Sequence, residues 1–453
     1  MNESRKIFIA GTGKSGISAA HLVLKLGGEV MLYNSNPDTD VEAVLKNFDD
    51  SQSVELVTGS LFQGHLRGVA ICVLSPGISI NADFVETINK AGVPVMGELE
   101  FASQILKGKI VGITGTNGKT TTTALTGLLM GKKYQDVKVA GNIGLPLSDV
   151  ANLTTEESVS VIEVSSFMLE TISTFKPHVS AITNITPDHL DRHGSMANYI
   201  AVKEDITMNQ TEDDYVVLNY EDDVLRGFGE SRNLKPHVVW FSSQNEPDGD
   251  SLFLRDGVIC LKEDGIVTEL ISTRELKIIG KHNYENAMTA AACAWKMGVP
   301  LEAIREGLGE FTAVPHRIEF VRERCGVRYY NDSKGTNTDA AIQALNAMPG
   351  PTVLIGGGYD KGSEFDDWVK LFNGKVKQLI LLGDTRNKIF ETCRKYGFSN
   401  ITMVDDMNEA VITAASYADE GEYVLLSPAC ASWDMYKSFE HRGDHFKKLV
   451  MEL

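Results

Sequence analysis

Cysteine is scarce in this chain, and no two cysteines stand close together. Six cysteines are spread over 453 residues without a C-x-x-C pair, so their spacing indicates neither a zinc site nor a dense disulfide framework. Long apolar runs are also missing. No stretch is long enough to span a bilayer, and the early run KIFIA is too short for a signal peptide. We therefore expect a cytoplasmic protein without membrane insertion.

Basic residues are in short supply as well. The chain has 43 Lys and Arg against 61 Asp and Glu, a formal net charge of -18. Nucleic acids and anionic membranes attract basic surfaces, so neither is expected as the main partner. A small anionic substrate can still bind to local lysines, backbone N–H groups and metal ions. The expected state of the chain is monomeric.

Short apolar runs alternate with helix-length amphipathic stretches along most of the chain, which is typical of βα units and parallel sheets. The alternation pauses near residues 101–109 and near Pro315, in line with the roughly three domains that this length allows. We predict an α/β fold of three domains, 1–107, 108–312 and 313–453, each a mainly parallel sheet with flanking helices. The first and third are expected to be Rossmann-like and the central one P-loop ATPase-like.

The first predicted strand ends in a glycine-rich turn. IAGTGKSG places Gly11, Gly13 and Gly16 in the pattern G-x-G-x-x-G, which brings a helix N-terminus close to a phosphate. A NAD site would need an acidic residue after the second strand, but Asn34 and Ser35 stand there. NAD is therefore disfavoured, a nucleotide diphosphate is allowed, and a turn without any ligand is the alternative.

The segment GITGTNGKTTTTAL ends like a phosphate-binding loop but has unusual spacing. Gly118, Lys119 and Thr120 fit the end of G-x-x-x-x-G-K-[ST], whereas the first glycine would fall on Ile113 and the nearest is Gly115. The segment follows a predicted strand and opens a predicted helix, where N–H groups and the helix dipole favour an anion. Lys119 would neutralise the outer phosphates of ATP, and the Thr120 hydroxyl could bind Mg²⁺.

Other predicted strands of the central part also end in polar residues. EVSSF brings Glu163 and DHLDRH brings His189 to adjacent strand ends, where a carboxylate and a histidine could hold a divalent cation. Each of them alone could equally be a residue that only local hydrogen bonds satisfy. Lys203, in YIAVKED, would by itself belong to a solvated helix face.

Three polar loops follow predicted strands in the last third of the chain. NDSKGTN, GGGYDKG and SPACAS would share one sheet edge and bring Lys334, Thr336, Lys361 and Ser432 toward one place. Such a set suits a small dicarboxylic amino acid. Solvated loops without a ligand are the alternative.

Taken together, these motifs resemble those of the Mur ligases, the ATP-dependent enzymes that build the peptide of the bacterial cell-wall precursor. The resemblance rests on TGTNGKTTT, GNIG, EVSSF, DHLDRH, KHNYEN, PHRIEF, NDSKGTN and SPACASWDMYKSFEHRG, in the family's order and over essentially the whole chain. The shortened phosphate loop resembles the family's own variant. The N-terminal glycine-turn domain and the C-terminal run resemble the member that adds D-glutamate.

The resemblance implies a ligase that joins D-glutamate to UDP-N-acetylmuramoyl-L-alanine through an acyl phosphate, using ATP and two Mg²⁺ ions. It implies catalytic roles for Lys119, Glu163, His189 and Lys203, and metal ligation by Thr120, Glu163, His189 and a carbamylated Lys203. The implied ATP contacts are Gly115, Thr116, Asn117, Gly118, Lys119, Thr120, Thr121, Asn283, Asn286, Arg317 and Asp332. The implied contacts of the UDP-substrate are Lys14, Ser15, Ser35, Asn36, Gly77, Asn142 and Ser165, and those of D-glutamate are Thr336, Lys361, Ser432 and Phe439.

One residue departs from the family pattern, and other functions stay open. Met168 stands where relatives commonly carry a glutamine that contacts the substrate, so it is left out of the predicted site. Another amino-acid-adding Mur ligase or a folylpolyglutamate synthetase-like enzyme is the nearest alternative. A Rossmann oxidoreductase would require NADH binding, and a nucleotide-binding module without enzymatic activity would need no amino-acid pocket.

Overall fold

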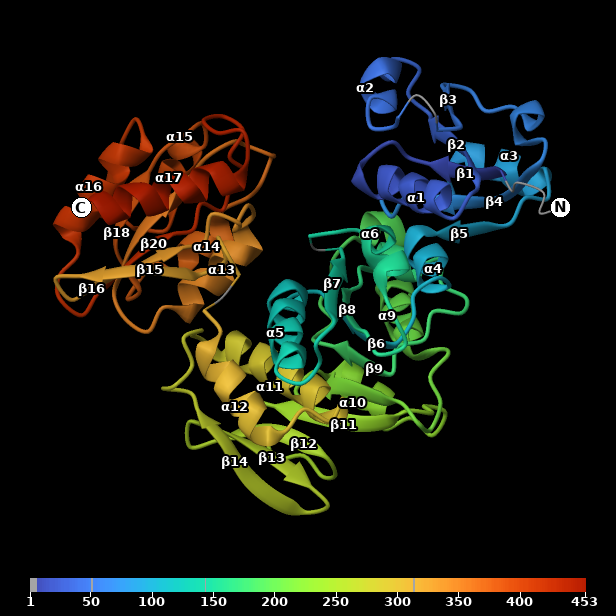
Figure 1. Cartoon of the computed structure of the whole chain (residues 1–453). Helices are drawn as coiled ribbons and strands as arrows, with labels where there is room; N and C mark the ends of the chain where they lie inside the picture. Colours follow the sequence, from blue (N-terminus) through green and yellow to red (C-terminus); the bar gives the residue numbers. More distant parts are fainter. Residues whose placement is uncertain (1–5, 50–51, 143, 313) are drawn as a thin grey trace. The chain divides into compact units, whose positions relative to one another are not determined.

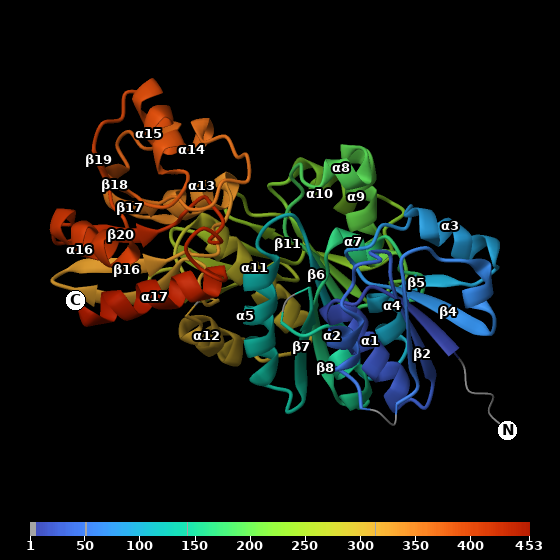
Figure 2. The same cartoon turned by 90° about the horizontal axis from the view of Figure 1, so that it is seen from above.

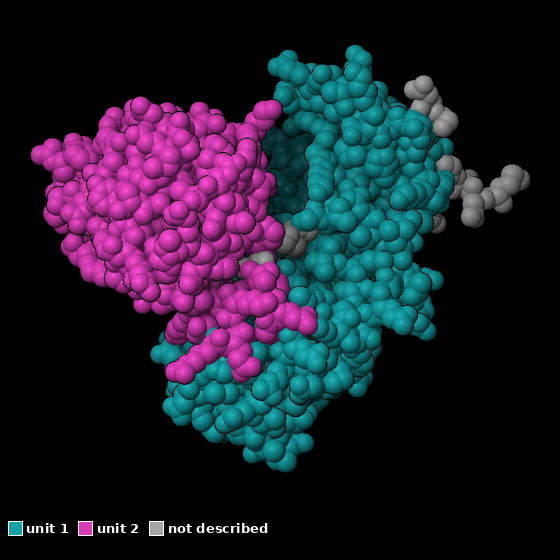
Figure 3. Space-filling model, turned by 60° about the vertical axis from the view of Figure 1, so that its left-hand side comes forward, with its two compact units in different colours: residues 1–273, 285–308 teal, residues 274–284, 309–453 magenta. Residues whose placement is uncertain are grey.

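The computed structural model describes residues 6–49, 52–142, 144–312 and 314–453. Contacts divide the chain into two compact units, coloured separately in Figure 3. The first comprises residues 1–273 and 285–308, and the second comprises residues 274–284 and 309–453. Among the described residues, no helix is both long and apolar enough to cross a membrane. The six cysteines are free thiols.

The first sheet of unit 1 has the strand order β3-β2-β1-β4-β5, and its strand pairs are parallel. Its elements are β1 (Lys6–Ala10), α1 (Lys14–Lys25), β2 (Glu29–Asn34), α2 (Val41–Leu45), β3 (Val54–Thr58), β4 (Val69–Leu74), α3 (Asp83–Lys90) and β5 (Val95–Gly97). Alternate side chains of β1 enter two apolar clusters, one shared with α1 and one with α3. Helices therefore cover both faces of this Rossmann-like sheet, drawn in blue in Figure 1.

The second sheet of unit 1 has the order β14-β13-β12-β11-β10-β9-β6-β8-β7. Its strands are β6 (Lys109–Thr114), β7 (Val137–Gly141), β8 (Val159–Glu163), β9 (Val179–Ile182), β10 (Tyr215–Asn219), β11 (His237–Ser242), β12 (Ser251–Arg255), β13 (Val258–Glu263) and β14 (Ile266–Ser272). The strands from β7 to β12 pair in parallel, whereas β12, β13 and β14 form an antiparallel extension that the sequence pattern did not predict.

The helices of this central part range from 4 residues in α6 to 16 residues in α11. They are α4 (Glu98–Ser103), α5 (Lys119–Gly131), α6 (Leu147–Val150), α7 (Ser166–Leu169), α8 (Leu190–His193), α9 (Met196–Glu204), α10 (Asp223–Gly229), α11 (Lys281–Lys296) and α12 (Leu301–Glu310). Helix α4 joins the two sheets of unit 1 through buried carboxylates. Glu98 accepts a hydrogen bond from the Ser148 N–H (2.7 Å), and Glu100 accepts from the N–H groups of Ser173, Thr174 and Phe175.

The sheet of unit 2 has the order β15-β16-β20-β17-β18-β19, with only β15 antiparallel to its neighbour among the described strands. Its elements are β15 (Glu319–Arg324), β16 (Val327–Asn331), α13 (Thr338–Ala347), β17 (Thr352–Gly356), α14 (Asp366–Lys370), β18 (Val376–Leu381), α15 (Arg386–Lys395), β19 (Ile401–Met403), α16 (Met407–Tyr417), β20 (Tyr423–Leu426) and α17 (Phe439–Glu452). One apolar cluster packs α13, α14 and α15 on one face, and another packs α16 and α17 on the other (Figure 2).

Candidate active site

The phosphate loop, residues 115–118, connects β6 to α5 and requires glycine at both ends. Gly115 has a φ of +141° and Gly118 a φ of +84°. A Cβ atom on Gly115 would lie 1.9 Å from Thr183 Oγ1, and one on Gly118 would lie 2.3 Å from Asn286 Oδ1. Backbone conformation and space therefore both exclude a side chain at these positions. The predicted ATP residue Asn286, which is distant in sequence, lies directly beside the loop.

The segment after β9 fixes the shape of the phosphate loop. The N–H groups of Thr116 and Asn117 donate to the backbone and side-chain oxygens of Asn184, each at 2.9 Å, and Thr183 Oγ1 donates to the Asn117 carbonyl at 2.6 Å. These two loop N–H groups are thus held by protein. Helix α5 begins at Lys119, and the N–H groups in the first turn of a helix point out of its end, where an anion can accept from them. Together with the positive end of the helix dipole, they form the natural phosphate position.

Two lysine ammonium groups meet at the carbonyl of Gly115. Lys119 Nζ donates to it at 2.9 Å and to the Thr116 carbonyl at 2.8 Å, and Lys203 Nζ donates to the Gly115 carbonyl at 2.8 Å. Lys203 is only 1% exposed. The residue pattern by itself predicted a solvated helix face for Lys203, and that prediction is wrong. Burial, followed by the charge of Lys119, lowers the pKa of Lys203 to about 7. A large fraction of this amine is therefore uncharged and nucleophilic near neutral pH.

Glu163 lies at the end of β8 with one carboxylate oxygen satisfied and the other not. It is 2% exposed, and its Oε1 accepts a hydrogen bond from Asn142 Nδ2 at 2.8 Å. Its Oε2 is buried without a hydrogen-bond partner among the described residues. A buried carboxylate oxygen of this kind suits a cation, and the buried residue Thr120 supplies a hydroxyl at the start of α5.

A cation beside Glu163 would need ligands of other kinds as well. Among the described residues, no group of three or more His, Cys, Asp or Glu side chains could hold a metal ion. Phosphate oxygens, the Thr120 hydroxyl or a carboxylated Lys203 would have to complete the coordination. The donor set therefore fits Mg²⁺ that arrives with a phosphate ligand, which is how Mg²⁺ is usually bound.

His189 lies in the loop before α8 and adopts a left-handed backbone conformation, with a φ of +50°. Its side chain is 49% exposed, its Nε2 lies 3.6 Å from Asp188 Oδ2, and its ring packs 4.8 Å from that of Phe167. An exposed imidazole that is held by an aromatic ring is available to a ligand. The metal or proton-transfer role of His189 stays a prediction.

The predicted UDP-substrate residues follow β1, β2 and β4, whose carboxyl ends share one sheet edge. Gly11 has a φ of +105°, and a Cβ atom on Gly16 would lie 1.9 Å from the Gly11 carbonyl oxygen, so the turn needs these glycines. Lys14 and Ser15 open α1, while Ser35, Asn36 and Gly77 lie in exposed or partly exposed loops. Lys14 Nζ donates to the carbonyl of Gly144.

Two further predicted substrate residues stand at strand ends of the central sheet. Asn142 follows β7, and its side-chain amide donates a hydrogen bond to Glu163. Ser165 caps α7, where its hydroxyl accepts a hydrogen bond from the Met168 N–H at 3.3 Å. Met168 itself is 3% exposed and belongs to the apolar core. Its omission from the predicted site stays a prediction.

In unit 2, two of the three predicted polar loops, NDSKGTN and SPACAS, meet at Arg442, a residue that the sequence analysis missed. Its guanidinium donates to the carbonyls of Ser333 (2.9 Å), Cys430 (3.0 Å) and Ala431 (3.1 Å). Burial lowers the pKa of Arg442 to about 10. The Arg442 hydrogen bonds hold the loops that carry Thr336 and Ser432 in place. The motif EHRG gave no local signal for this role.

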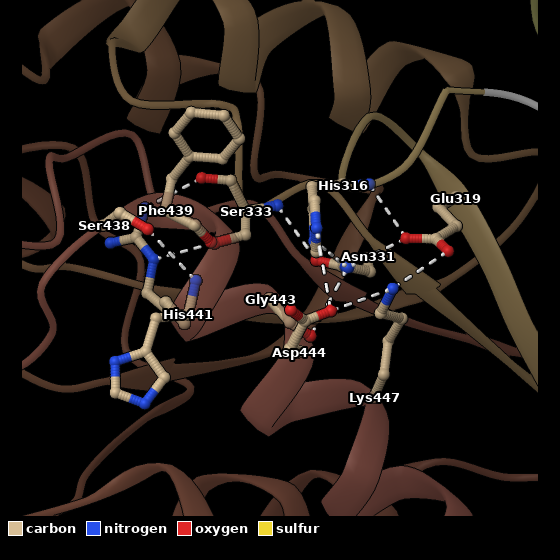
Figure 4. A network of polar contacts seen from close by, with 11 residues as sticks. His316, Glu319, Asn331, Ser333, Ser438, Phe439, His441, Gly443, Asp444 and Lys447 are labelled. Carbon is tan, nitrogen blue, oxygen red and sulfur yellow. Dashed lines mark hydrogen bonds and ion pairs between the residues drawn. The ribbon is translucent and has the colours of Figure 1, made fainter. Parts of the chain in front are cut away.

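Figure 4 shows a second network in unit 2, around His316 and the start of α17. His316 has a φ of +65°, its N–H donates to Glu319 Oε2 at 2.8 Å, and its Nδ1 lies 3.0 Å from Asn331 Nδ2. Lys447 Nζ lies 3.2 Å from Glu319 Oε1. The network fixes the backbone on both sides of the predicted ATP residue Arg317. At the other end of the view, the carbonyl of Phe439 accepts a hydrogen bond from Ser333 Oγ at 2.8 Å.

Lys361, a predicted D-glutamate residue, has its ammonium group over the aromatic ring of Trp433. Its Nζ lies 4.8 Å from the centre of the Trp433 ring, and the rings of Tyr359 and Trp433 are 5.6 Å apart. The Tyr359 N–H donates to the Ala431 carbonyl at 2.9 Å, which joins this loop to the one that carries Ser432. Trp433 is 62% exposed. The structure thus brings Lys361 and Ser432 to neighbouring loops.

Thr121, another predicted ATP contact, is 4% exposed in the first turn of α5. Two further predicted nucleotide residues, Asn283 and Asp332, lie in unit 2 and are buried. Asn283 is 7% exposed and donates from Nδ2 to the Ile279 carbonyl at 2.8 Å. Asp332 is 3% exposed, and its carboxylate accepts from Ser427 Oγ at 2.8 Å and from the Ile318 N–H at 3.3 Å. Their roles as ATP contacts stay predictions, as do those of the other proposed site residues.

Three family models match the chain one after another. They are the Mur ligase MurD-like N-terminal domain over residues 5–97, the Mur ligase middle domain over residues 113–294 and the Mur ligase, glutamate ligase domain over residues 316–430. The UDP-N-acetylmuramoylalanine–D-glutamate ligase of Lachnoclostridium phytofermentans is 47% identical over 99% of this chain and 98% of its own length. The chain belongs to the Mur ligase family.

Other known proteins give the same result. The UDP-N-acetylmuramoylalanine–D-glutamate ligase of Lachnospira eligens is 46% identical to this Mur ligase over 100% of this chain and 99% of its own. The solved UDP-N-acetylmuramate-alanine ligase of Thermotoga maritima superposes with a TM-score of 0.60 at 18% identity, over 99% of this chain and 100% of that chain. The predicted family and the α/β fold with mainly parallel sheets are confirmed. The predicted domain boundaries stay predictions.

Replacing Asp332 by asparagine in this Mur ligase is expected to change how stability depends on pH. Burial raises the pKa of Asp332 to about 7, against the Ser427 hydrogen bond and the charge of Arg317. In the unfolded chain an aspartate releases its proton near pH 4. Folded protein therefore binds more protons than unfolded protein between about pH 4 and 7, and stability falls there with rising pH, by at most about 1.4 kcal/mol per pH unit.

The measurement compares thermal unfolding midpoints of the whole wild-type chain and of Asp332→Asn at pH 5 and pH 7.5. The midpoint of Asp332→Asn relative to wild type should rise at the higher pH, because the variant has no proton to lose at this position. Asp339→Asn, on the exposed start of α13, is the control and should show no such trend. If the difference in unfolding midpoint between Asp332→Asn and wild type is the same at both pH values, the assigned pKa of Asp332 is contradicted.

Proposed function

We propose that this Mur ligase joins D-glutamate to UDP-N-acetylmuramoyl-L-alanine, with hydrolysis of ATP to ADP and phosphate. The observation that carries the proposal is the 47% identity, over 98% of its length, to a relative named for this activity. The phosphate loop, the ammonium groups of Lys119 and Lys203 beside it, and the three polar loops of unit 2 support the proposal. The proposed substrates are small molecules, and the proposed working form is a monomer.

The chemical problem is that a carboxylate does not react with an amine at neutral pH, because oxide is a very poor leaving group. In the proposed reaction, an oxygen of the alanine carboxylate attacks the γ-phosphorus of ATP, and ADP leaves. The resulting acyl phosphate is attacked at its acyl carbon by the amine of D-glutamate. The tetrahedral intermediate then collapses to the amide and expels phosphate.

The chain's own groups must screen the negative charge that gathers during phosphoryl transfer. The first turn of α5 would bind the phosphates of ATP, and Lys119 would turn from its loop carbonyls toward the outer phosphates. Thr120 and Glu163 would hold one Mg²⁺ ion, and His189 and Lys203 a second. Mg²⁺ held by these residues would supply positive charge against the phosphates. The ammonium group of D-glutamate must lose a proton before its amine can attack, and His189 or a neighbouring group would accept that proton.

Lys203 can serve as a metal ligand only if its charge is reversed. A neutral lysine amine adds to CO₂ and releases one proton, which leaves a carbamate that resembles a carboxylate. The burial of Lys203 and its pKa of about 7 supply the uncharged amine that this addition requires. We propose this modification because an ammonium group would repel Mg²⁺.

The remaining assignments follow the family pattern onto matching residues. The sugar nucleotide would lie along Lys14, Ser15, Ser35, Asn36 and Gly77, and would continue past Asn142 and Ser165. ATP would contact the phosphate loop, Thr121, Asn283, Asn286, Arg317 and Asp332. D-Glutamate would contact Thr336, Lys361, Ser432 and Phe439. The sugar-nucleotide set and the D-glutamate set lie in loops that follow parallel strands or at the start of the next helix.

Replacing Trp433 by leucine is expected to raise the KM for D-glutamate by about threefold, the worth of an exposed cation–π contact. The Trp433 ring holds the Lys361 ammonium in place, so its loss would leave that ammonium less ordered. Trp433→Phe keeps an aromatic face, so its KM for D-glutamate should rise less than that of Trp433→Leu. The KM for ATP should stay unchanged in both variants. Equal KM values for D-glutamate in wild type and Trp433→Leu would contradict this role.

The proposed function is tested by phosphate release from ATP with UDP-N-acetylmuramoyl-L-alanine and D-glutamate, L-glutamate, L-lysine or meso-diaminopimelate in turn. We expect turnover with D-glutamate but with none of the other three amino acids. Mass spectrometry should then show a product that is heavier than the sugar nucleotide by one glutamyl residue. Turnover with a different amino acid would keep the ligase chemistry and overturn the assignment of the unit 2 loops. ATP binding without turnover on any of them would contradict the proposal.

A further inference from the structure

Arg192 ties the two sheets of unit 1 together next to the candidate site. It belongs to α8, three residues after His189. Its guanidinium donates to the backbone carbonyls of Ile78 at 3.0 Å and of Gly77 at 3.4 Å, in the loop that follows β4 of the first sheet. The donors thus belong to the central part of the chain, and the acceptors to the part predicted to bind the uridine diphosphate end of the substrate.

The guanidinium of Arg192 is held from its own side by an acid and an aromatic ring. Arg192 Nη2 lies 2.6 Å from Glu170 Oε2, and the guanidinium carbon lies 4.4 Å from the centre of the Phe167 ring. The side chains of Arg192 and Glu170 are 15% and 9% exposed. A largely buried, bidentate arginine has little freedom to reorient, so its position is fixed before any ligand binds.

The same aromatic ring also holds His189. The ring of Phe167 lies 4.8 Å from that of His189 and 5.7 Å from that of His193, which stacks on it. His193 is buried and contacts Glu170 Oε1 at 3.4 Å. Ser166 Oγ lies 3.0 Å from His193 Nε2. The loop at Gly77 and the loop at His189 are therefore bound to one cluster of side chains, which we call the Arg192 cluster: Ser166, Phe167, Glu170, Arg192 and His193.

We propose that Arg192 is a positioning residue that sets the spacing between the diphosphate subsite at Gly77 and the reacting end of the substrate near His189. The inference rests on the proposed function, because only a substrate that reaches from one sheet to the other needs this spacing. The two ends of such a substrate are covalently joined. Binding at one end therefore raises the effective concentration at the other only if the two subsites stand at the matching distance.

This role differs from a direct contact with the substrate. Arg192 acts on backbone carbonyls of the substrate loop, so its loss should leave each subsite intact and loosen only the relation between them. A ligand that fills one subsite should not be affected by the change. A ligand that spans both should be bound more weakly by roughly tenfold, the scale of one lost charge-assisted hydrogen bond to a carbonyl.

The experiment measures the binding of two ligands to the whole chain by titration calorimetry. The ligands are UDP alone, which can fill only the subsite of the first sheet, and UDP-N-acetylmuramoyl-L-alanine. Arg192→Gln removes the charge and most of the donors. Arg232→Gln, at an exposed position outside the cluster, is the matched control. Arg192→Lys, which keeps the charge but not the paired donors, is the second variant in case Arg192→Gln does not fold.

We expect both Arg192 variants to bind the full sugar nucleotide about tenfold more weakly than wild type and to bind UDP within twofold of wild type. Equal weakening for both ligands would show damage to the Gly77 loop itself and would overturn the inference. Unchanged binding of both ligands would also overturn it. Failure of the wild-type chain to bind the sugar nucleotide would count against the proposed function instead, which keeps the two failures distinguishable.

Discussion

A Lys119→Met variant of this Mur ligase is expected to fold and to lose about a thousandfold in kcat, the upper range for one lost transition-state donor. Lys119 opens α5, where its ammonium group donates to two carbonyls of its own phosphate loop. These contacts can be exchanged for phosphate oxygens without a change of backbone. Methionine keeps most of the length and apolar body of the lysine side chain but cannot neutralise charge as the phosphoryl group moves.

The measurement is the rate of phosphate release at saturating substrates, together with the thermal unfolding midpoint. Lys46→Met is the matched control, since Lys46 is 70% exposed and pairs with Glu42 one helical turn away. Its kcat should equal that of wild type. A Lys119→Met variant that keeps more than about a tenth of wild-type kcat would contradict the role of the loop, because one transition-state donor is worth at least about a hundredfold.

A Lys203→Ala variant is expected to lose at least about a hundredfold in kcat and to regain part of it when formate or acetate is added. Alanine removes the amine that is proposed to carry the carbamate and leaves space in a buried position. A short carboxylate can enter this space and supply the missing negative oxygens. Lys203→Arg fills the space with a permanent positive charge, so it should be inactive and should not respond to formate.

The carbamate also predicts a dependence of wild-type activity on CO₂ and pH. The uncharged amine fraction falls as pH drops through the Lys203 pKa of about 7. Activity in CO₂-depleted buffer should therefore decline below neutral pH and return when bicarbonate is added. Rescue of Lys203→Arg by formate to the same extent as Lys203→Ala would contradict the account. So would full activity of Lys203→Ala without any added carboxylate.

The parts of the candidate site whose local conformation could be predicted from the sequence lie close together in the chain. Gly115, Gly118 and Lys119 lie within five residues of one another, and their conformation depends on the strand-to-helix turn that contains them. The glycine turn at Gly11 and Gly16 is local in the same way. Strand ends such as Glu163 could be placed because parallel strands bring their carboxyl ends to one edge.

The residues that the sequence analysis missed act over long separations in the chain. Arg442 holds Ser333 from 109 positions away, and Arg192 reaches Ile78 across 114 positions. No periodicity or spacing reports such a contact. Lys203 shows the same limit, since a lysine in such a helix was expected to face solvent, whereas the fold buries it beside the Gly115 carbonyl. Only the family resemblance pointed to it.

One feature of the fold did have a local signal that the strand pattern overlooked. The antiparallel extension β12–β14 turns at Asp256–Gly257 and Asp264–Gly265, and these four residues have positive φ values between +49° and +79°. Asp-Gly pairs between short apolar strands are a strong signal of two-residue hairpins. The two Asp-Gly pairs predict antiparallel hairpins in this stretch, in place of the parallel βα units that were expected.

The central claim, that the chain activates a carboxylate through an acyl phosphate before amide formation, is tested most directly with ¹⁸O. UDP-N-acetylmuramoyl-L-alanine labelled in both carboxylate oxygens is incubated with ATP and D-glutamate, and the masses of both products are measured. The account predicts one ¹⁸O in the released phosphate and one in the new amide. Phosphate without ¹⁸O would contradict it, because the carboxylate oxygen would then not have been the atom that attacked ATP.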